Sequence, residues 1–355
     1  MHKSLLRTGL VLACSSVYGA VAFAQNDSIL DALQSVSTST VPANGDLNPY
    51  GVAIVPANFP GGGSVAPGNV LVANFNNSSN VQGTGTTIVS ISPAGQSLFA
   101  TSTLIGLDTA LGVLSGGYVL VGNLPVTNGT PGTGSLQIFD KNGNHVATLN
   151  DPLLDSPWDL TIQDKGSTAL VFVSNVLSGT VTRLKLSISN TGVKVVSKTQ
   201  IGSGFGAQPN TAAVVVGPTG LAYNPVRDVL YVASTADNKI FGIEDAAGRT
   251  KSAGTGSLVF ADDTLLHGPL GLTLGFNGNL ITANGDAVNA GGTPNDLVEF
   301  TQEGVLVAHH QLDGGAPGGA FGIADTVSRG TVRFAAVDDD LNALTIWTLQ
   351  PHPVF

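Results

Sequence analysis

The chain has 355 residues and a formal net charge of −10 at pH 7, and only 11% of its residues are charged. Because an acidic surface repels phosphate groups and no cluster of lysine and arginine occurs, the sequence excludes nucleic acid and anionic membrane surfaces as expected partners. Glycine is abundant, with 46 residues, and beyond the first residues no segment has the sustained apolar period of an amphipathic helix, so the composition favours an all-β protein.

The first 24 residues predict a secretory signal peptide. Lys3 and Arg7 precede an apolar run that is too short to span a bilayer, and an A-x-A motif ends at Ala24. We therefore expect cleavage after Ala24 and a periplasmic or extracellular protein. Loss of the two basic residues would take the net charge from −10 to −12.

Cys14 is the only cysteine and lies within this leader. The mature chain would then have no disulfide, no thiolate nucleophile and no cysteine metal ligand. An alternative stays open at this position, because Val-Leu-Ala-Cys at 11–14 resembles a bacterial lipobox, in which Cys14 would become a lipid-anchored first residue.

A strand followed by a turn with a fixed glycine recurs along the rest of the chain. The copies are ISPAGQ, FDKNGN, ISNTGV and FTQEGV, with their glycines at positions 95, 143, 192 and 304. Glycine at this point supplies the positive φ that a tight hairpin needs. A fifth copy, IEDAAG, ends at Gly248 and is one residue longer, as expected of a bulged hairpin.

A second signature, a small residue in a short apolar strand, opens each repeat. Its central positions are 51, 112, 159, 220, 271 and 322, which are 47 to 61 residues apart. Units of this length made only of strands are typical of propeller blades. We expect residues 25–355 to form one domain, a six-bladed β-propeller.

The last repeat ends at its third strand, residues 344–349, and leaves too little chain for a fourth. Because a propeller closes without a free edge, the missing outer strand should come from the N-terminal side. The alternating, Ser/Thr/Val-rich residues 34–41 are the candidate. The alternative is that this polar segment is a disordered leader.

The stretch LAYNPVRDVLYVASTADNKIFGI, within residues 217–243, resembles NHL repeats and, more broadly, the SMP-30/gluconolactonase-like six-bladed superfamily. The resemblance implies the six-bladed fold, with calcium-dependent lactone hydrolysis as one activity and the binding platforms of NHL proteins as another. The superfamily's metal-ligand positions fall on Thr219, on Ser234 and on residues 48–51, which contain no carboxylate.

Polar residues end the second strand of each predicted blade. They are Asn74, Asn123, Asn175, Ser234, Asn284 and Asp338. Such a ring could hydrogen-bond a small polar ligand or coordinate calcium, with Asn175, Asn284, Asp338 and Asp159 as the candidate metal ligands. Alternatively, these side chains cap strand ends, as Asn and Asp commonly do.

Two further residues lie where first strands begin. His267 is the candidate general base, because it should face the axis. Trp158 could stack on a ligand or pack between blades. Two functional hypotheses follow: a non-catalytic scaffold that binds a small polar ligand or a protein partner, or a metal-dependent hydrolase of lactones or related esters.

Overall fold

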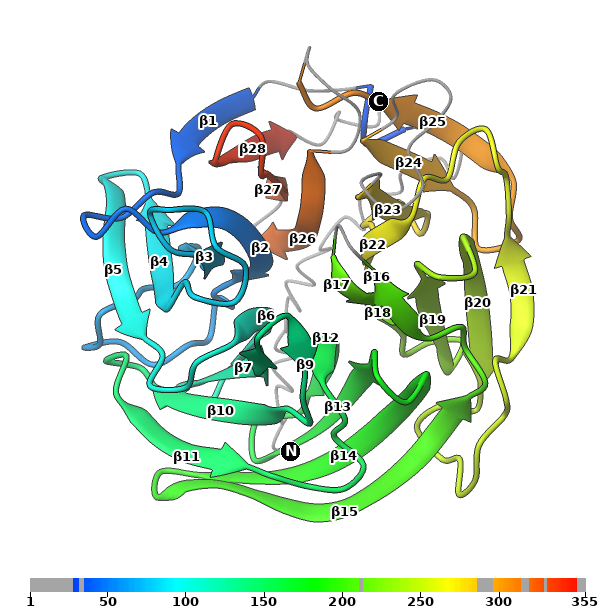
Figure 1. The fold of residues 1–355 in the computed structure, drawn as a ribbon, viewed down its shortest axis with the longest axis horizontal. Coiled ribbons are helices and arrows are strands. Elements are labelled where there is room, and N and C mark those ends of the chain that lie inside the picture. The colour runs from blue at the N-terminus through cyan, green and yellow to red at the C-terminus, as the bar shows by residue number, and fades with distance from the viewer. Residues whose placement is uncertain are drawn as a thin grey trace, which may run out of the picture.

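The computed structural model describes residues 28–31, 35–210, 213–285, 296–313, 319–328 and 331–349. These residues form six four-stranded antiparallel sheets that stand around a central axis, as Figure 1 shows. The predicted all-β, six-bladed propeller is confirmed. The described residues include no helix that could span a membrane, and the predicted leader with Cys14 lies outside them.

Blades 1 to 5 each use one continuous stretch of chain, with the first strand nearest the axis. Blade 1 contains β2 (Leu47–Ile54), β3 (Val70–Asn76), β4 (Thr87–Ser92) and β5 (Gly95–Thr101), and blade 2 contains β6 (Leu107–Leu114), β7 (Tyr118–Leu124), β10 (Ser135–Asp140) and β11 (His145–Leu149). Blade 3 contains β12 (Pro157–Asp164), β13 (Thr168–Asn175), β14 (Thr180–Ser189) and β15 (Gly192–Ser203). Blade 4 contains β18 (Pro218–Asn224), β19 (Val229–Ser234), β20 (Lys239–Glu244) and β21 (Ser257–Phe260), and blade 5 contains β22 (Pro269–Leu274), β23 (Leu280–Asn284), β24 (Leu297–Phe300) and β25 (Leu306–His310).

Blade 6 draws on both ends of the chain. Its inner strands are β26 (Ala320–Ser328), β27 (Thr331–Asp338) and β28 (Ala343–Leu349), and its outer strand is β1 (Ser35–Ser39). The pairing is antiparallel, with Ser35 opposite Trp347 and Ser39 opposite Ala343. The first and last described strands therefore lie side by side.

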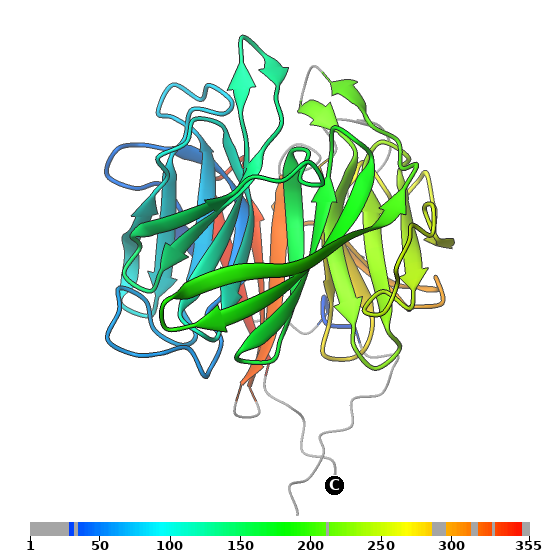
Figure 2. The same cartoon turned by 90° about the horizontal axis from the view of Figure 1, so that it is seen from below.

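We call the face where first strands begin and second strands end the top face, and the opposite one the bottom face. Two small hairpins project from the top face in Figure 2. They are β8 (Val126–Thr127) with β9 (Thr130–Pro131), and β16 (Gln208–Asn210) with β17 (Val214–Val216).

The hydrophobic core lies between blades. Leu114 and Leu120 of blade 2, for example, pack with Val171 and Leu184 of blade 3, and each is at most 1% exposed. Burying such a side chain contributes roughly 1.5–3 kcal/mol, so the stacking of neighbouring sheets stabilises the ring.

The turn glycines at 95, 143, 192 and 304 all have positive φ, between 81° and 140°, as the hairpin signature predicted. The prediction that Gly248 ends a bulged hairpin was wrong. Twelve residues, 245–256, separate β20 from β21, so the connection is a long loop rather than a bulged hairpin. In this loop the residues with positive φ are Asp245, Gly254 and Gly256.

Candidate active site

A ring of six residues, five of them glycine or alanine, surrounds the axis just below the top face. Each first strand contains a bulge of two residues relative to its partner, and the second bulge residues are Gly51, Ala110, Asp159, Gly220, Gly271 and Gly322. We call these six positions the collar. The sequence signature had placed the blade 2 member at Gly112, and the strand register moves it to Ala110.

Glycine dominates the collar because adjacent first strands approach too closely for a side chain. A Cβ atom on Gly322 would lie 1.9 Å from the carbonyl oxygen of Tyr50, and one on Gly51 would lie 2.1 Å from that of Thr109. Both distances are far inside van der Waals contact.

We expect Gly322→Ala to lower the free energy of unfolding by about 3 kcal/mol, because the new methyl group must push blades 6 and 1 apart. Gly248→Ala is the matched control, since a Cβ there meets no atom within 4 Å and φ is not positive. Urea unfolding of both variants checks the prediction. Equal midpoints would mean that the collar is not closely packed.

Asp159 is the exception in this collar, because it brings a carboxylate to a position where the other blades have glycine or alanine. Its Oδ1 accepts the N–H of Leu160 at 2.8 Å, and its Oδ2 accepts the N–H of Leu221, in the next blade, at 3.1 Å. Burial raises the pKa of Asp159 to about 7, although both N–H donors act to lower it. The group can therefore exchange a proton near neutral pH.

Below the collar the axis widens into a polar channel with a volume of about 180 Å³. Asp159, Thr161, Thr273 and Asp325 line it, together with apolar side chains of all six first strands. Thr273 Oγ1 donates a hydrogen bond of 2.6 Å to Asp325 Oδ1, and burial raises the pKa of Asp325 to about 6. The channel thus contains two carboxyl groups that titrate near neutrality.

The channel continues toward the bottom face. Val113 and Ile162 line both the channel and a second cavity of about 520 Å³, whose other residues include Asp164 at the end of β12 and Ser115 and Lys165 in the turns between first and second strands. The two cavities therefore adjoin at the apolar side chains of Val113 and Ile162.

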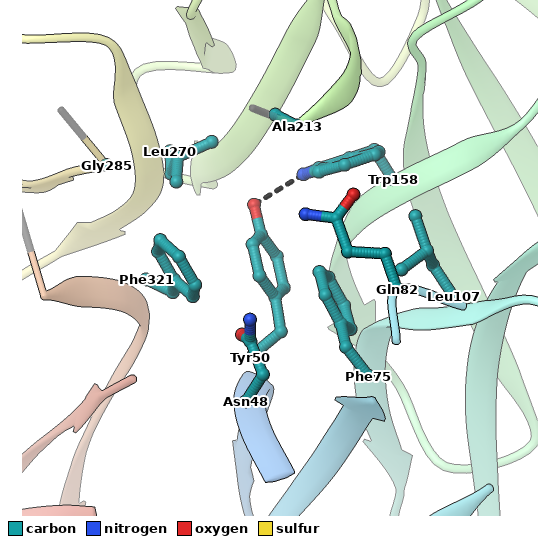
Figure 3. A pocket seen from close by; sticks show the side chains of 10 residues that line it. All are labelled: Asn48, Tyr50, Phe75, Gln82, Leu107, Trp158, Ala213, Leu270, Gly285 and Phe321. Atoms are coloured by element: carbon teal, nitrogen blue, oxygen red, sulfur yellow. Dashed lines mark hydrogen bonds between the residues drawn. The ribbon is translucent and has the colours of Figure 1, made fainter. Parts of the chain in front are cut away.

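Above the collar, by contrast, the axis is filled by aromatic side chains, which Figure 3 shows. The rings of Tyr50 and Phe75 stack with centroids 4.5 Å apart, and Phe321 lies 5.3 Å from Tyr50. Trp158 Nε1 donates a hydrogen bond to the Tyr50 hydroxyl. Burial holds the pKa of Tyr50 well above its usual value. Only about 40 Å³ of free space remains, roughly enough for one or two water molecules.

Trp158 is one of the predicted ligand-binding residues, and it is 3% exposed within this aromatic cluster. Its ring is edge-on to both Tyr50 and Phe75. This is the packing between blades that the sequence left open as an alternative. Stacking of Trp158 on a ligand stays a prediction.

The polar ring at the ends of the second strands is buried, so its members do not face solvent. Each bonds to nearby chain instead: Asn74 Nδ2 to the carbonyl of Thr40, Asn123 Nδ2 to Asp108 Oδ1, Asn175 Nδ2 to Thr182 Oγ1, Asn284 Nδ2 to the carbonyl of Leu265, Ser234 Oγ to Asp237 Oδ2, and Asp338 Oδ1 to the N–H of Leu341. These contacts are those of strand-end caps. Ligand binding by the ring stays a prediction.

His267 is 4% exposed and is bonded within its own turn. Its Nε2 lies 3.0 Å from the carbonyl oxygen of Thr264, and its backbone N–H donates to Asn284 Oδ1. It lines neither the channel nor the aromatic cluster. Proton transfer by His267 therefore stays a prediction.

The residues around the upper axis do not fit calcium. A calcium ion takes six to eight oxygen ligands at about 2.3–2.6 Å. The residues that line this space are mainly aromatic rings and leucines, and their side-chain oxygens are those of Asn48, Gln82 and Tyr50 alone, too few for such a shell. Of the four predicted ligands, Asp159 lies in the collar, while Asn175, Asn284 and Asp338 are bonded at the tops of three blades. The described residues include no group of three or more His, Cys, Asp or Glu side chains that could hold a metal ion.

Sequence reasoning missed Asp325. One signal was available, because in Phe-Gly-Ile-Ala-Asp at 321–325 the residues Ile323 and Asp325 alternate along a first strand and so should face the same side. The structure shows that this side is the channel.

The fold is that of the SMP-30/gluconolactonase-like six-bladed propellers, as the resemblance implied, with a polar channel below its collar. No protein-family model matches the sequence, and no curated protein is significantly similar to it. A gluconolactonase from Xanthomonas campestris is similar in structure over 90% of this chain and 90% of its own, with a TM-score of 0.54 and 13% identity. A luciferin-regenerating enzyme is similar over 90% and 97%, with a TM-score of 0.53 and 12% identity. The calcium-binding protein regucalcin from Agrobacterium tumefaciens is similar over 87% and 93%, with a TM-score of 0.50 and 12% identity.

These neighbours contradict the first of the two functional hypotheses, a non-catalytic binding scaffold. The gluconolactonase and the luciferin-regenerating enzyme are both named as enzymes, and each matches nine tenths of this chain. The comparison favours the hydrolase hypothesis over the scaffold.

Proposed function

We propose that the protein is a hydrolase of lactones or related esters and that its reaction takes place in the axial channel. The observation that carries the proposal is the Asp159 carboxylate, which the collar holds at the head of a polar channel with a pKa of about 7. The lactonase among the structural neighbours supports the reaction class.

Asp159 is the proposed general base. In its ionised form it takes a proton from a water molecule while the water oxygen attacks the carbonyl carbon of the lactone. When the ring C–O bond breaks, the protonated carboxyl returns the proton to the leaving alkoxide. The products are a hydroxy acid, or an acid and an alcohol, and Asp159 ends ionised as it began.

The surroundings of Asp159 suit this cycle. The N–H groups of Leu160 and Leu221 fix the carboxylate in one orientation. Asp325 places a second titratable carboxyl in the same channel, where Thr273 orients it. A substrate that reaches Asp159 must be small and polar, because the channel holds only about 180 Å³.

The resemblance also implied that hydrolysis depends on calcium. The reaction proposed for this chain does not require calcium. Regucalcin is named a calcium-binding protein, but the upper axis of this chain is lined mainly by aromatic and leucine side chains, with Asn48, Gln82 and Tyr50 as its side-chain oxygen donors. The proposed reaction uses carboxyl groups alone.

The predicted leader bears on where in or outside the cell this activity takes place. Because residues 1–24 have the features of a secretory signal peptide, we propose that the mature protein acts in the periplasm or outside the cell. Its partner would be a small polar substrate.

A hydrolysis assay on a panel of lactones and esters, with and without a chelator, tests the proposal. We expect turnover of at least one small lactone, unchanged by the chelator. Absence of turnover across the panel would overturn the proposed function. Turnover abolished by the chelator and restored by calcium would overturn the carboxyl-only reaction.

A further inference from the structure

The outer strand of blade 3, β15, is much longer than the outer strands of the other blades. It has 12 residues, whereas β1, β5, β11, β21 and β25 have 4 to 7. Its neighbour in the sheet is β14, and Figure 1 shows it on the outer rim of the ring. Because an edge strand directs part of its N–H and C=O groups away from its neighbour, a long edge strand is a template for a further strand.

One end of this edge is already covered by the chain itself. In the loop between β20 and β21 of blade 4, the Ala253 N–H donates to the carbonyl oxygen of Ile201 at 2.9 Å, and the Gly254 carbonyl oxygen accepts the Ser203 N–H at 2.9 Å. Ile201 is buried there, whereas residues 194–198 are all exposed. The edge that accepts the loop therefore continues along the same strand into solvent.

The exposed part of β15 carries two large apolar side chains. Val195 is 38% exposed and Val196 is 59% exposed. Val196 is the extra residue of a bulge, because Val195 lies opposite Leu186 and the next paired residue, Ser197, lies opposite Lys185. Side chains of an added strand would pack against both valines as cross-strand neighbours.

The surface around β15 is basic, although the protein is acidic. Residues 165–227 hold six of the 14 lysines and arginines and none of the 24 acidic residues, which leaves 8 basic against 24 acidic residues elsewhere. Strand pairing brings Lys185 and Lys194 onto one face of the sheet, since Lys194 lies opposite Ser187, and both lysines are exposed. Blade 3 therefore attracts an anionic partner that the rest of the protein repels.

A second copy of this chain does not fit this edge. Pairing of β15 with another β15 would bring the lysines of both strands together, and like charges opposite each other destabilise a sheet. The outer strands of the other five blades contain no aspartate or glutamate that could complement these lysines. The complementary strand therefore belongs to a different protein.

We propose that residues 193–199 are a docking site for an extended, acidic segment of another protein, which adds to blade 3 as a fifth strand. Backbone hydrogen bonds to the edge of β15 provide affinity, and Lys185 and Lys194 select aspartate and glutamate in the partner. The site is separate from the proposed active site, because β15 contributes no residue to the axial channel.

Binding of a synthetic peptide to the purified protein tests the proposal. The probe is a fluorescein-labelled peptide of seven residues that alternates glutamate with valine and threonine. One control peptide has lysine in place of glutamate, and the other has a fully N-methylated backbone. We expect the glutamate peptide alone to bind, and to bind more weakly as salt rises. Equal binding of the N-methylated peptide would show charge attraction without strand addition and would overturn the proposal, as would a lack of binding by the glutamate peptide.

A charge reversal on β15 places the peptide. Lys194→Glu should weaken binding of the glutamate peptide about fivefold or more, because an attraction becomes a repulsion. Lys239→Glu, the same change at an exposed residue of β20, is the matched control and should bind as the unmodified protein does. Equal weakening in the two variants would mean that the peptide senses only the net charge, which contradicts docking at β15.

Hydrogen exchange shows whether a strand is added. Amides among residues 193–199 that point away from β14 should exchange freely in the protein alone and at least tenfold more slowly with the glutamate peptide bound. Exchange that the peptide leaves unchanged would exclude strand addition. If the protein alone sediments as a dimer and already protects these amides, a second copy is the occupant and the proposed acidic partner is wrong.

Discussion

Asp159→Asn is expected to lower kcat/KM on the responsive lactone by about 10²- to 10⁴-fold, the usual contribution of a general base. The amide has nearly the same shape as the carboxylate but cannot accept the proton of the attacking water. In the unmodified protein kcat/KM should rise about tenfold per pH unit below pH 7 and level off above it, because the base must be ionised and burial raises the pKa of Asp159 to about 7. Initial rates between pH 5 and 9 measure both effects.

A second variant distinguishes loss of the general base from loss of the folded structure. Asp159→Gly installs the residue that four other blades carry in the collar, so it should fold as those blades do and be as inactive as Asp159→Asn. Asp245→Asn, at an exposed loop residue with positive φ, is the control that should keep full activity. An active Asp159→Gly protein would remove Asp159 from the mechanism and leave the fold assignment untouched.

The protein should be more stable in mild acid than at pH 8. Burial raises the pKa of Asp108 and Asp159 to about 7 and that of Asp325 and Asp338 to about 6, with neighbouring carboxylates adding to the shift of Asp338. A carboxyl group whose folded pKa is raised binds its proton more tightly in the native state. Its stabilising effect is complete below the unfolded pKa, near 4, and is lost as pH rises to 7.

Asp108 should make the largest contribution, because it is fully buried and its Oδ2 has no hydrogen-bond partner. A shift to about 7 corresponds to about 4 kcal/mol. Carboxylates whose pKa is lowered, such as Asp140 and Asp151, are largely solvated, so they offset little of this.

Calorimetry at pH 5, 6 and 8 measures the effect. We expect a Tm about 5 °C or more lower at pH 8 than at pH 5. Asp108→Asn should flatten the curve, because its amide oxygen can still accept from Asn123 and Gln137 while no charge is buried. Parallel curves for the two proteins would show that Asp108 ionises without cost.

The sequence was sufficient for the architecture because blades are local units. The turn glycines and the small residues that open each blade mark hairpins and close strand contacts, and both depend on backbone geometry within one repeat. In blade 2 the small residue that opens the blade was predicted at Gly112, whereas the structure has it at Ala110. The difference arose because the blade 2 bulge lies two residues earlier than the apolar pattern indicates.

The candidate site was harder to predict from the sequence, because its properties depend on contacts between blades. Asp159 was identified as a residue of a first strand, but its proton affinity depends on Leu221 of the next blade and on a channel that six separate strands enclose. The asparagines at the strand ends were found at the right positions, yet turn geometry directs their side chains into their own blades. No pattern in residues 48–51 predicted that the Tyr50 hydroxyl would accept a hydrogen bond from Trp158 across the axis.

This contact makes Trp158 an intrinsic fluorescence probe. The chain has two tryptophans, and the indole of Trp158, in blade 3, is bonded to the phenol of Tyr50, in blade 1. Because these blades are not neighbours in the ring, the pair can form only when the hub has assembled. In a Trp347→Phe background, the emission of Trp158 would follow hub assembly in real time, independently of the far-ultraviolet signal of the strands.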